Sequence, residues 1–276
     1  MEIIEKLIQS KTGDIETCED SYFFDQNFVA VIDGATSVSG RYYDGKTQGQ
    51  LATGTVKQAI GTLSGNEDFS EILEVINTYF ETLYQYMGIA EEVKTTSYLR
   101  PSAAMILYSR QRSKIWIVGD CQCFFSGDIY QNIKHIDEVL AEARSVVVQA
   151  EIMKGKTVEE ILEVGDFGFD LIKPLIQKQY NFQNADPNHP LSYGSVNGNP
   201  IPQELIKTIK VPENVTELSL ATDGYPKIWG TLEETEAELA RIIKEDPLCI
   251  YENMSTKGMV KGNVSFDDRT YIRIKL

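Results

Sequence analysis

Four aspartates of this chain stand where a run of apolar residues typical of a buried β-strand stops, and three of them adjoin a glycine. A carboxylate in such a place must be solvated or meet a counter-charge. One Asp-Gly pair after a strand is an ordinary turn, but four sites spread over most of the chain favour strand ends that deliver carboxylates to one edge of a sheet. The four are Asp33 after Phe28–Ile32, Asp120 after Ile115–Gly119, Asp223 after Leu218–Thr222, and Asp267 after Ser265-Phe266.

Clustered carboxylate oxygens are the ligands that hard divalent cations such as Mg²⁺ and Mn²⁺ prefer. A glycine such as Gly34 lets the backbone approach an ion closely, and its carbonyl can serve as a ligand. A further acidic pair, Glu19-Asp20, precedes the first strand of an expected hairpin, which would bring Asp20 close to Asp33. Taken alone, that pair is more typical of a solvated acidic loop.

Composition and charge limit the kinds of partner. The chain has 276 residues, 42% of them hydrophobic, which suffices for a large buried core and argues against disorder. Its net charge is −15, from 26 basic and 41 acidic residues, which argues against nucleic acid or an anionic membrane as partner.

The N-terminal residues and the cysteines favour a cytoplasmic protein. Met1–Lys6 carries early acids and no apolar core of signal-peptide length, and no apolar run approaches the ~20 residues that span a bilayer. The pair Cys121 and Cys123 lacks the C-x-x-C spacing of zinc and redox sites, so the cysteines are expected to be reduced structural thiols.

The order of the expected elements indicates an α+β fold. Hairpins are expected at 22–32, 103–118 and 122–133, a strand at 218–222 and a closing strand at 269–276. Helices are expected at 51–63, at 69–87 with Asp68 and Glu71 as a capping pair, over much of 137–179, and at 232–244 behind a capping box at Thr231. Clustered hairpins with long helices between and after them favour antiparallel sheets covered by helices rather than a parallel sheet. No linker or repeat is present, so residues 1–276 are expected to form a single domain.

Other catalytic constellations are weakly represented. There is no G-x-S-x-G elbow and no Gly-rich phosphate loop, and the only histidines are His135 and His189. The chemistry of this chain is therefore expected to belong to carboxylates and metal.

Read in order, five short motifs resemble those of the metal-dependent protein phosphatases of the type 2C (PPM) class. They span nearly the whole chain and fall in the order of that family. They are Glu19-Asp20; Val29-Ala30-Val31-Ile32-Asp33-Gly34; Pro101-Ser102-Ala103-Ala104-Met105 leading to Val118-Gly119-Asp120-Cys121; Leu220-Ala221-Thr222-Asp223-Gly224; and Asp267-Asp268-Arg269-Thr270.

The resemblance implies a four-layer αββα sandwich, in which two antiparallel β-sheets are flanked by helices, with two Mn²⁺ or Mg²⁺ ions at one end. By motif match, Asp33 would bridge both ions, the Gly34 carbonyl would hold one, and Asp223 and Asp267 would hold the other. Glu19 and Asp20 would act partly through metal-bound water, and Asp120 would belong to a third, weaker ion. The region 137–202 would include a variable flap beside the site.

Two departures from the family pattern concern the phosphate side of the site. Many members have an arginine five residues before the acid that matches Asp20, where this chain has Ile15; Lys11 or Arg41 are possible substitutes. Many members also have a histidine after the Asp-Gly pair, where this chain has Ala35. Asp268 replaces the asparagine that usually follows the ligand aspartate.

The leading hypothesis is a phosphatase that hydrolyses phosphomonoesters, with phosphoserine or phosphothreonine in proteins as the expected substrate. A hydroxide that bridges the two metals would attack phosphorus in line, without a covalent enzyme intermediate. The alternative is a non-catalytic, phosphatase-like module that binds metal and phosphopeptide for regulation, which Ile15 and Ala35 favour. Hydrolysis of a small phosphorylated metabolite is a third reading that the sequence does not separate from the first.

Overall fold

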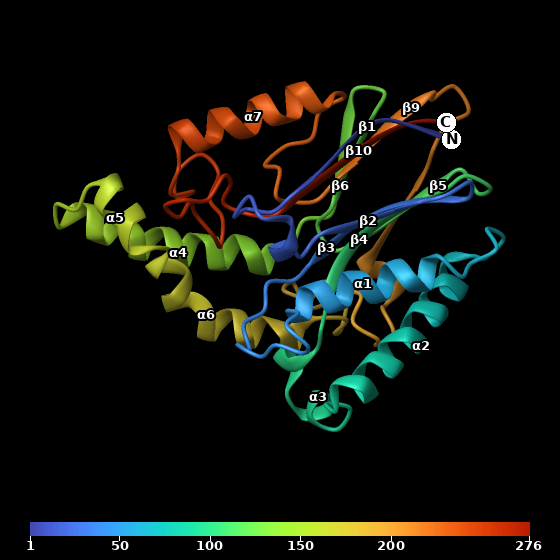
Figure 1. The fold of residues 1–276 in the computed structure, drawn as a ribbon, viewed down its shortest axis with the longest axis horizontal. Coiled ribbons are helices and arrows are strands. Elements are labelled where there is room, and N and C mark those ends of the chain that lie inside the picture. Colours follow the sequence, from blue (N-terminus) through green and yellow to red (C-terminus); the bar gives the residue numbers. More distant parts are fainter.

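The computed structural model describes residues 1–276, which form two five-stranded antiparallel sheets with helices around them (Figure 1). The first sheet has the order β1-β10-β9-β6-β7, with β1 at Glu2–Gln9, β10 at Arg269–Lys275, β9 at Glu217–Ala221, β6 at Gln122–Phe125 and β7 at Asp128–Gln131. The second sheet has the order β2-β3-β4-β5-β8, with β2 at Ser21–Phe24, β3 at Phe28–Gly34, β4 at Ala103–Ser109, β5 at Lys114–Val118 and β8 at Ile206–Lys210. The prediction of two antiparallel sheets in an α+β sandwich is confirmed.

The apolar run of β3 is buried on both faces because the strand lies between two layers. Val29 and Val31 pack into the cluster between the two sheets, whereas Phe28, Ala30 and Ile32 pack against helices on the other side. Successive side chains of a strand point to opposite faces, so a strand covered on both sides reads as a continuous apolar run.

Helices α1 (Gln48–Ile60) and α2 (Phe69–Met87) cover the outer face of the second sheet, and α7 (Leu232–Glu245) covers the first. The capping box predicted for α2 is present, since Asp68 accepts from the Glu71 backbone and Glu71 accepts from the Asp68 backbone. At α7 only half of the predicted capping box forms. The Thr231 side chain accepts a hydrogen bond from the Glu234 amide, but the Glu234 carboxylate accepts from the Thr231 hydroxyl instead of the Thr231 backbone amide.

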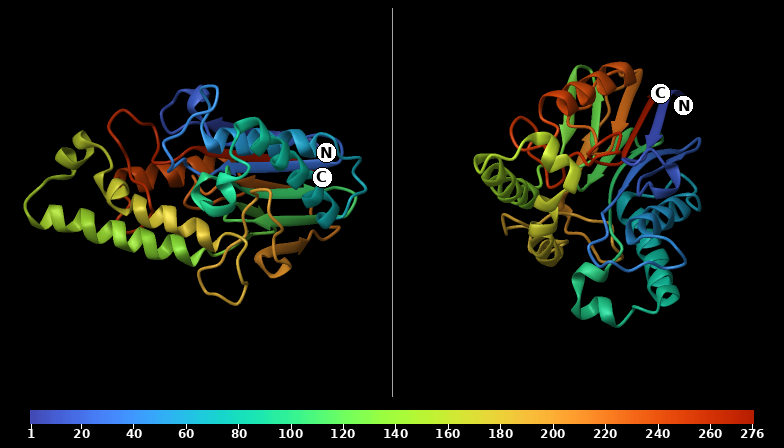
Figure 2. Two further views of the ribbon diagram at one scale, coloured as in Figure 1. Left: turned by 90° about the horizontal axis from the view of Figure 1, so that it is seen from below. Right: turned by 60° about the vertical axis from the view of Figure 1, so that its left-hand side comes forward.

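Three helices project beyond one end of the sandwich (Figure 2). They are α4 (His135–Met153), α5 (Val158–Val164) and α6 (Phe167–Gln179). The chain between them breaks at Gly155 and Gly165, whose positive φ angles of 99° and 84° suit glycine. We call the segment 137–202, which contains most of these helices and the loop after them, the flap. A short helix, α3 (Glu92–Thr95), lies between α2 and β4.

Two strands of the structure were not predicted from the sequence. In β1 the exposed residues are Glu2, Ile4 and Lys6, two of which are charged, and β8 is half-buried or exposed along its whole length. Both are edge strands, and an edge strand with one wet face lacks the apolar run that marks a central one. None of the helices is long and apolar enough to cross a membrane.

Candidate metal centre

Two of the four predicted aspartates come from the same edge of the second sheet. Strands β3 and β5 both pair antiparallel with β4, so they run in the same direction and end at the same edge. Asp33 is in the last residues of β3, and Asp120 follows the end of β5 by two residues. The chain then crosses to the first sheet and begins β6.

The other two aspartates come from neighbouring strands of the first sheet. Strand β9 ends just before Asp223, and the antiparallel strand β10 begins just after Asp267. The ladder continues past the end of β9, where the Thr222 amide donates to the Thr270 carbonyl at 3.0 Å. Because the ends of an antiparallel pair alternate in direction, the end of β9 and the start of β10 lie at one edge.

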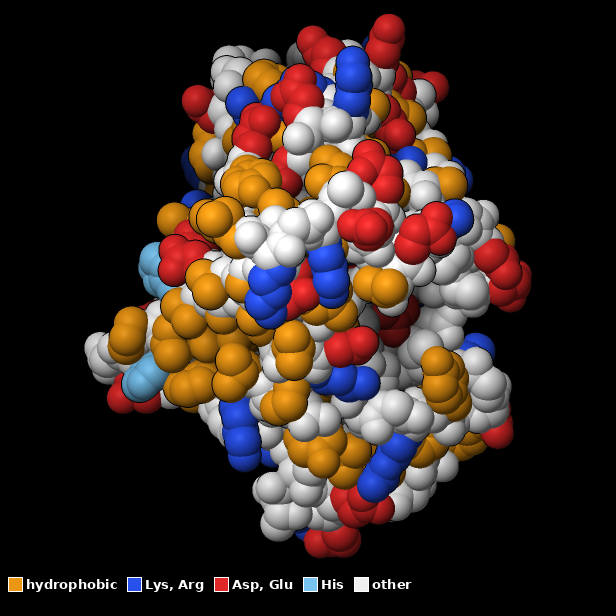
Figure 3. Space-filling model, turned by 90° about the vertical axis from the view of Figure 1, so that its left-hand side faces the viewer, with side chains coloured by type: hydrophobic (Ala, Val, Ile, Leu, Met, Phe, Trp, Pro, Cys, Tyr) orange, Lys and Arg blue, Asp and Glu red, His pale blue; other side chains and the backbone are white.

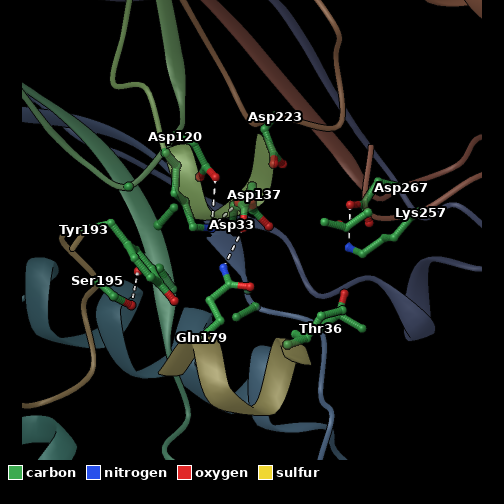
Figure 4. A pocket seen from close by; sticks show the side chains of 18 of the residues that line it. Asp33, Thr36, Asp120, Asp137, Gln179, Tyr193, Ser195, Asp223, Lys257 and Asp267 are labelled. Carbon is green, nitrogen blue, oxygen red and sulfur yellow. Dashed lines mark hydrogen bonds and ion pairs between the residues drawn. The ribbon is translucent and has the colours of Figure 1, made fainter. Parts of the chain in front are cut away.

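Three of these carboxylates converge. Asp33, Asp120 and Asp223 each offer an oxygen, and these oxygens all lie within 4.8 Å of one another (Figure 4). Asp33 and Asp120 are half-buried, and Asp223 is exposed. The group lies in a pocket at the end of the sandwich, so the structure brings three of the four predicted aspartates together.

Burial and the convergence of like charges raise the pKa of two members of this group. Burial raises the pKa of Asp33 well above its usual value, and the negative charges of Asp20 and Asp120 add to the rise. Burial and then the charge of Asp33 raise the pKa of Asp223 in the same way. The ammonium group of Lys134, 3.1 Å from Asp120, is the cation paired with this group. One lysine does not balance three carboxylates, so a further cation is needed to hold them ionised.

Two glycines let the backbone pass close to the centre. A Cβ on Gly34 would lie 2.5 Å from the Glu19 carbonyl oxygen, and one on Gly224 would lie 1.9 Å from the Asp268 carbonyl oxygen. No real Cβ tolerates such distances, so both Asp-Gly pairs need their glycine for close packing of neighbouring segments.

The acidic pair before β2 lies behind the three-carboxylate group. Ser21 pairs with Ile32, which brings Asp20 level with Asp33 across the hairpin. The hydroxyls of Thr222 and Thr270 both donate to Oδ2 of Asp20 at 2.9 Å, while its buried Oδ1 has no partner. Burial and the nearby carboxylate of Asp268 raise the pKa of Asp20 to about 7.

Glu19 has partners on both of its carboxylate oxygens. Its Oε1 accepts from the Thr47 hydroxyl at 2.5 Å, and Lys11 lies 4.0 Å from its Oε2. Burial raises the pKa of Glu19, although Lys11 and Thr47 counteract it. Glu19 is therefore placed beside the centre but is not one of the converging oxygens.

Asp267, the fourth predicted aspartate, is held apart by lysines. Lys257 lies 2.5 Å from its Oδ2 and Lys11 lies 3.4 Å from its Oδ1. Burial raises the pKa of Asp267, but these two ammonium groups outweigh it, and the pKa is lower than usual. Figure 4 shows Asp267 and Lys257 pointing at each other on one side of the pocket, apart from Asp120.

Residues at which this chain departs from the family pattern lie in different surroundings. Ile15 is an exposed residue of a 3₁₀ turn. Arg41 pairs with Glu92 at 2.8 Å on the surface and does not line the pocket, whereas Lys11 lies within reach of Asp267. Asp268, the third departure, accepts from the backbone amides of Lys11 and Glu19 at 2.8 and 2.9 Å. Its carboxylate thus ties the end of β1 to the segment before β2.

Only one half of this site has oxygen atoms arranged to bind a divalent cation. The three converging carboxylates form an all-oxygen donor set, and the unpartnered Oδ1 of Asp20 is a buried acceptor beside it. In the other half Asp267 is already paired with ammonium groups. The residues that could hold an ion are therefore Asp33, Asp120 and Asp223.

Four pocket residues had not been singled out from the sequence. Lys134, next to the start of α4, bridges Asp120 and Asp137, and Gln179 at the end of α6 donates to Asp137 at 2.5 Å. Lys257 comes from the loop before β10. None of these belongs to a sequence pattern, because each meets the site only through the tertiary fold. In Figure 3 this end of the molecule shows acidic side chains in a recess with Lys and Arg side chains at its margin.

No family model matches the sequence, and no curated protein matches it. Solved structures with similar folds include the serine/threonine phosphatase PstP/Ppp of Mycobacterium tuberculosis, at 15% identity and a TM-score of 0.45, covering 99% of this chain and 97% of that one. They also include the serine/threonine phosphatase Stp1 of Staphylococcus aureus, at 14% identity and a TM-score of 0.47, covering 100% and 96%. RsbX in complex with magnesium is similar at 12% identity and a TM-score of 0.41, covering 97% and 92%.

These similarities extend over nearly the full length of both chains. The chemistry of the present chain has to be judged from its own side chains.

Proposed function

We propose that this chain is a divalent-metal-dependent phosphatase that hydrolyses phosphoserine or phosphothreonine in proteins. The observation that carries the proposal is the convergence of Asp33, Asp120 and Asp223 within 4.8 Å at the base of an open pocket. A carboxylate group with too little positive charge around it is poised to bind a cation such as Mn²⁺ or Mg²⁺. When bound, such an ion would activate a water for in-line attack and offset charge on the phosphoryl oxygens.

The chain's own residues have distinct parts in this proposal. Asp33, next to Gly34, would be one ligand of the ion, and Asp223 and Asp120 would complete the set of oxygen ligands. Asp20 would hold ordered water with the oxygen that has no protein partner. Lys134 would keep Asp120 ionised and in place through its 3.1 Å ion pair.

The flap would contribute to substrate choice. Phe169, Ile176 and Gln179 of α6 line the pocket together with Tyr193 and Ser195 of the following loop. These side chains form the wall that a phosphorylated side chain would meet on its way to the carboxylates. A region of this kind can change specificity without changing the metal ligands.

The test is hydrolysis of a small aryl phosphate and of a phosphothreonine peptide by the full chain with Mn²⁺. Activity should vanish with chelator and fall by at least about a thousandfold in Asp33→Asn. The exposed Asp128, in the β6–β7 hairpin, offers a matched control, and Asp128→Asn should keep full activity. Activity that survives both the chelator and the Asp33 change would refute the metal mechanism.

The second candidate function is a phosphatase-like module that binds metal and phosphopeptide without turnover. Ile15 and Ala35, where many members of the family have an arginine and a histidine, favour it. Calorimetry separates the two. Metal-dependent binding of an intact phosphopeptide that is recovered unhydrolysed would support the module and count against the enzyme.

A further inference from the structure

The carboxylate of Asp267 is enclosed by two ammonium groups that the protein itself supplies. Lys257 lies 2.5 Å from one oxygen and Lys11 lies 3.4 Å from the other, so each oxygen of the carboxylate has its own cation. All three side chains are shielded from solvent, with exposed fractions of 21% for Lys257, 23% for Lys11 and 19% for Asp267. Ion pairs as enclosed as these are screened much less than surface pairs.

The backbone that carries Lys257 is fixed by a buried charge pair behind the pocket. Arg144 of α4, 2% exposed, pairs with Asp166 at 3.0 Å and donates to the Ser255 carbonyl at 3.3 Å. The other oxygen of Asp166 accepts from the Gly258 amide at 2.7 Å. Residues on both sides of Lys257 are thereby anchored, so the ammonium group is delivered to Asp267 by a rigid loop.

Charge is distributed unequally between the two halves of the site. Asp33, Asp120 and Asp223 have one ion-paired lysine among them, Lys134. On the other side, Lys11 lies within 4.0 Å of Asp267, Asp268 and Glu19, and Lys257 adds a second positive charge. Two lysines for three carboxylates leave that half with a formal charge of −1, whereas one lysine for three carboxylates leaves the first half at −2.

We propose that Lys257 takes the place beside Asp267 that a second metal ion would occupy. The centre would then bind one divalent ion tightly, at Asp33, Asp120 and Asp223. The lysine would be its second positive charge and would face the phosphoryl group from the side opposite the ion. This proposal rests on the proposed function, and it departs from the two-ion centre that the family resemblance implies.

The test counts ions without measuring catalysis. The chelator-stripped full chain is titrated with MnCl₂ by calorimetry, and free Mn²⁺ is followed in parallel by electron paramagnetic resonance. The wild type should bind one ion tightly. In Lys257→Ala a second ion should bind at least about tenfold more tightly than in the wild type, because a cation has left the site. Lys257→Arg should restore the one-ion behaviour.

Two further variants keep the test decisive if Lys257→Ala is unstable. Asp267→Asn should leave the count at one ion with little change in affinity, since Asp267 would not be a ligand; in a two-ion centre it would remove an ion. Lys261→Ala is the matched control, because Lys261 lies in the same loop and pairs with Glu163 on the surface. It should match the wild type.

Several outcomes would overturn the proposal. Two ions of similar affinity in the wild type, or a second ion unaffected by the loss of Lys257, would show that the lysine does not take an ion's place. A wild type that binds no ion would overturn both this inference and the metal centre. If the wild type binds one ion tightly and Lys257→Ala strengthens binding of a second, but no phosphate ester is hydrolysed, only the proposed enzymatic function is refuted.

Discussion

Replacing Asp33 with asparagine should stabilise the metal-free protein while it abolishes metal binding. One carboxylate oxygen from each of Asp33, Asp120 and Asp223 lies within 4.8 Å of the other two. Burial and these acidic neighbours raise the pKa of Asp33. The folded protein therefore gives up stability to hold these carboxylates together. An asparagine of the same shape removes one charge, so Asp120 and Asp223 each lose one of their two like-charged neighbours.

The size of the effect follows from the geometry. At an effective dielectric constant of about 20, two unit charges 4.8 Å apart repel by about 3.5 kcal/mol. Exposure of Asp223 to solvent and partial protonation reduce this cost, so we expect a gain of about 2 kcal/mol from Asp33→Asn near pH 8. For a chain of this length that gain is a rise in Tm of about 4 °C.

The assay is thermal unfolding with chelator and with Mn²⁺. In the wild type, Mn²⁺ at about 100 times its Kd should add about 2.7 kcal/mol of stability. Asp33→Asn should melt higher than the wild type in chelator and should not respond to Mn²⁺. The control Asp128→Asn should follow the wild type in both conditions. A variant that melts lower than the wild type in chelator, or that still responds to Mn²⁺, would refute the reasoning.

Three other changes test the surroundings of the site. The pKa of Asp20, about 7 in the folded protein, is about 4 in an unfolded chain, so the folded state keeps a proton that the unfolded state loses. The free energy of unfolding in chelator should therefore fall as the pH rises from about 4 through 7, and Mn²⁺ should reduce that fall, as urea titrations at each pH would show. Arg144→Met should cost about 3 to 5 kcal/mol by leaving its aspartate partner buried and unpaired, and a loss under 1 kcal/mol by urea titration would contradict this. Gly224→Ala should weaken Mn²⁺ binding in calorimetry, because its Cβ would lie 1.9 Å from the Asp268 carbonyl oxygen, while Gly54→Ala, with open space around it, should bind as the wild type does.

The parts of the fold that could be predicted are those in which local pattern and tertiary environment agree. The run Phe28–Ile32 is apolar throughout because the strand lies between two layers, and helix α2 repeats its apolar residues at helical spacing because one face packs on the second sheet. The carboxylates were visible for the same reason. A polar residue at the end of an apolar run can be recognised from the sequence alone.

The parts that could not be predicted depend on contacts between distant segments. The edge strand β1 carries charges on its exposed face and has no apolar run to mark it. Lys134 and Lys257 lie outside any strand or apolar run, and no periodicity singles them out from the chain's other lysines. The ion pairs that these lysines make with Asp120 and Asp267 form only when the sheet edges are assembled.

The two halves of the site differ in positive charge because different segments pack against their strand ends. Asp33 and Asp120 lie at strand ends of the second sheet and line the pocket, where Lys134 pairs with Asp120. Asp267 lies two residues before β10, at the end of the loop that the buried Arg144 anchors. The contact between Arg144 of the flap and this loop thus also helps to place Lys257 beside Asp267. An acidic motif read along the chain predicts where negative charge gathers, but the number of metal ions it can hold depends on the cations that the rest of the fold brings to it.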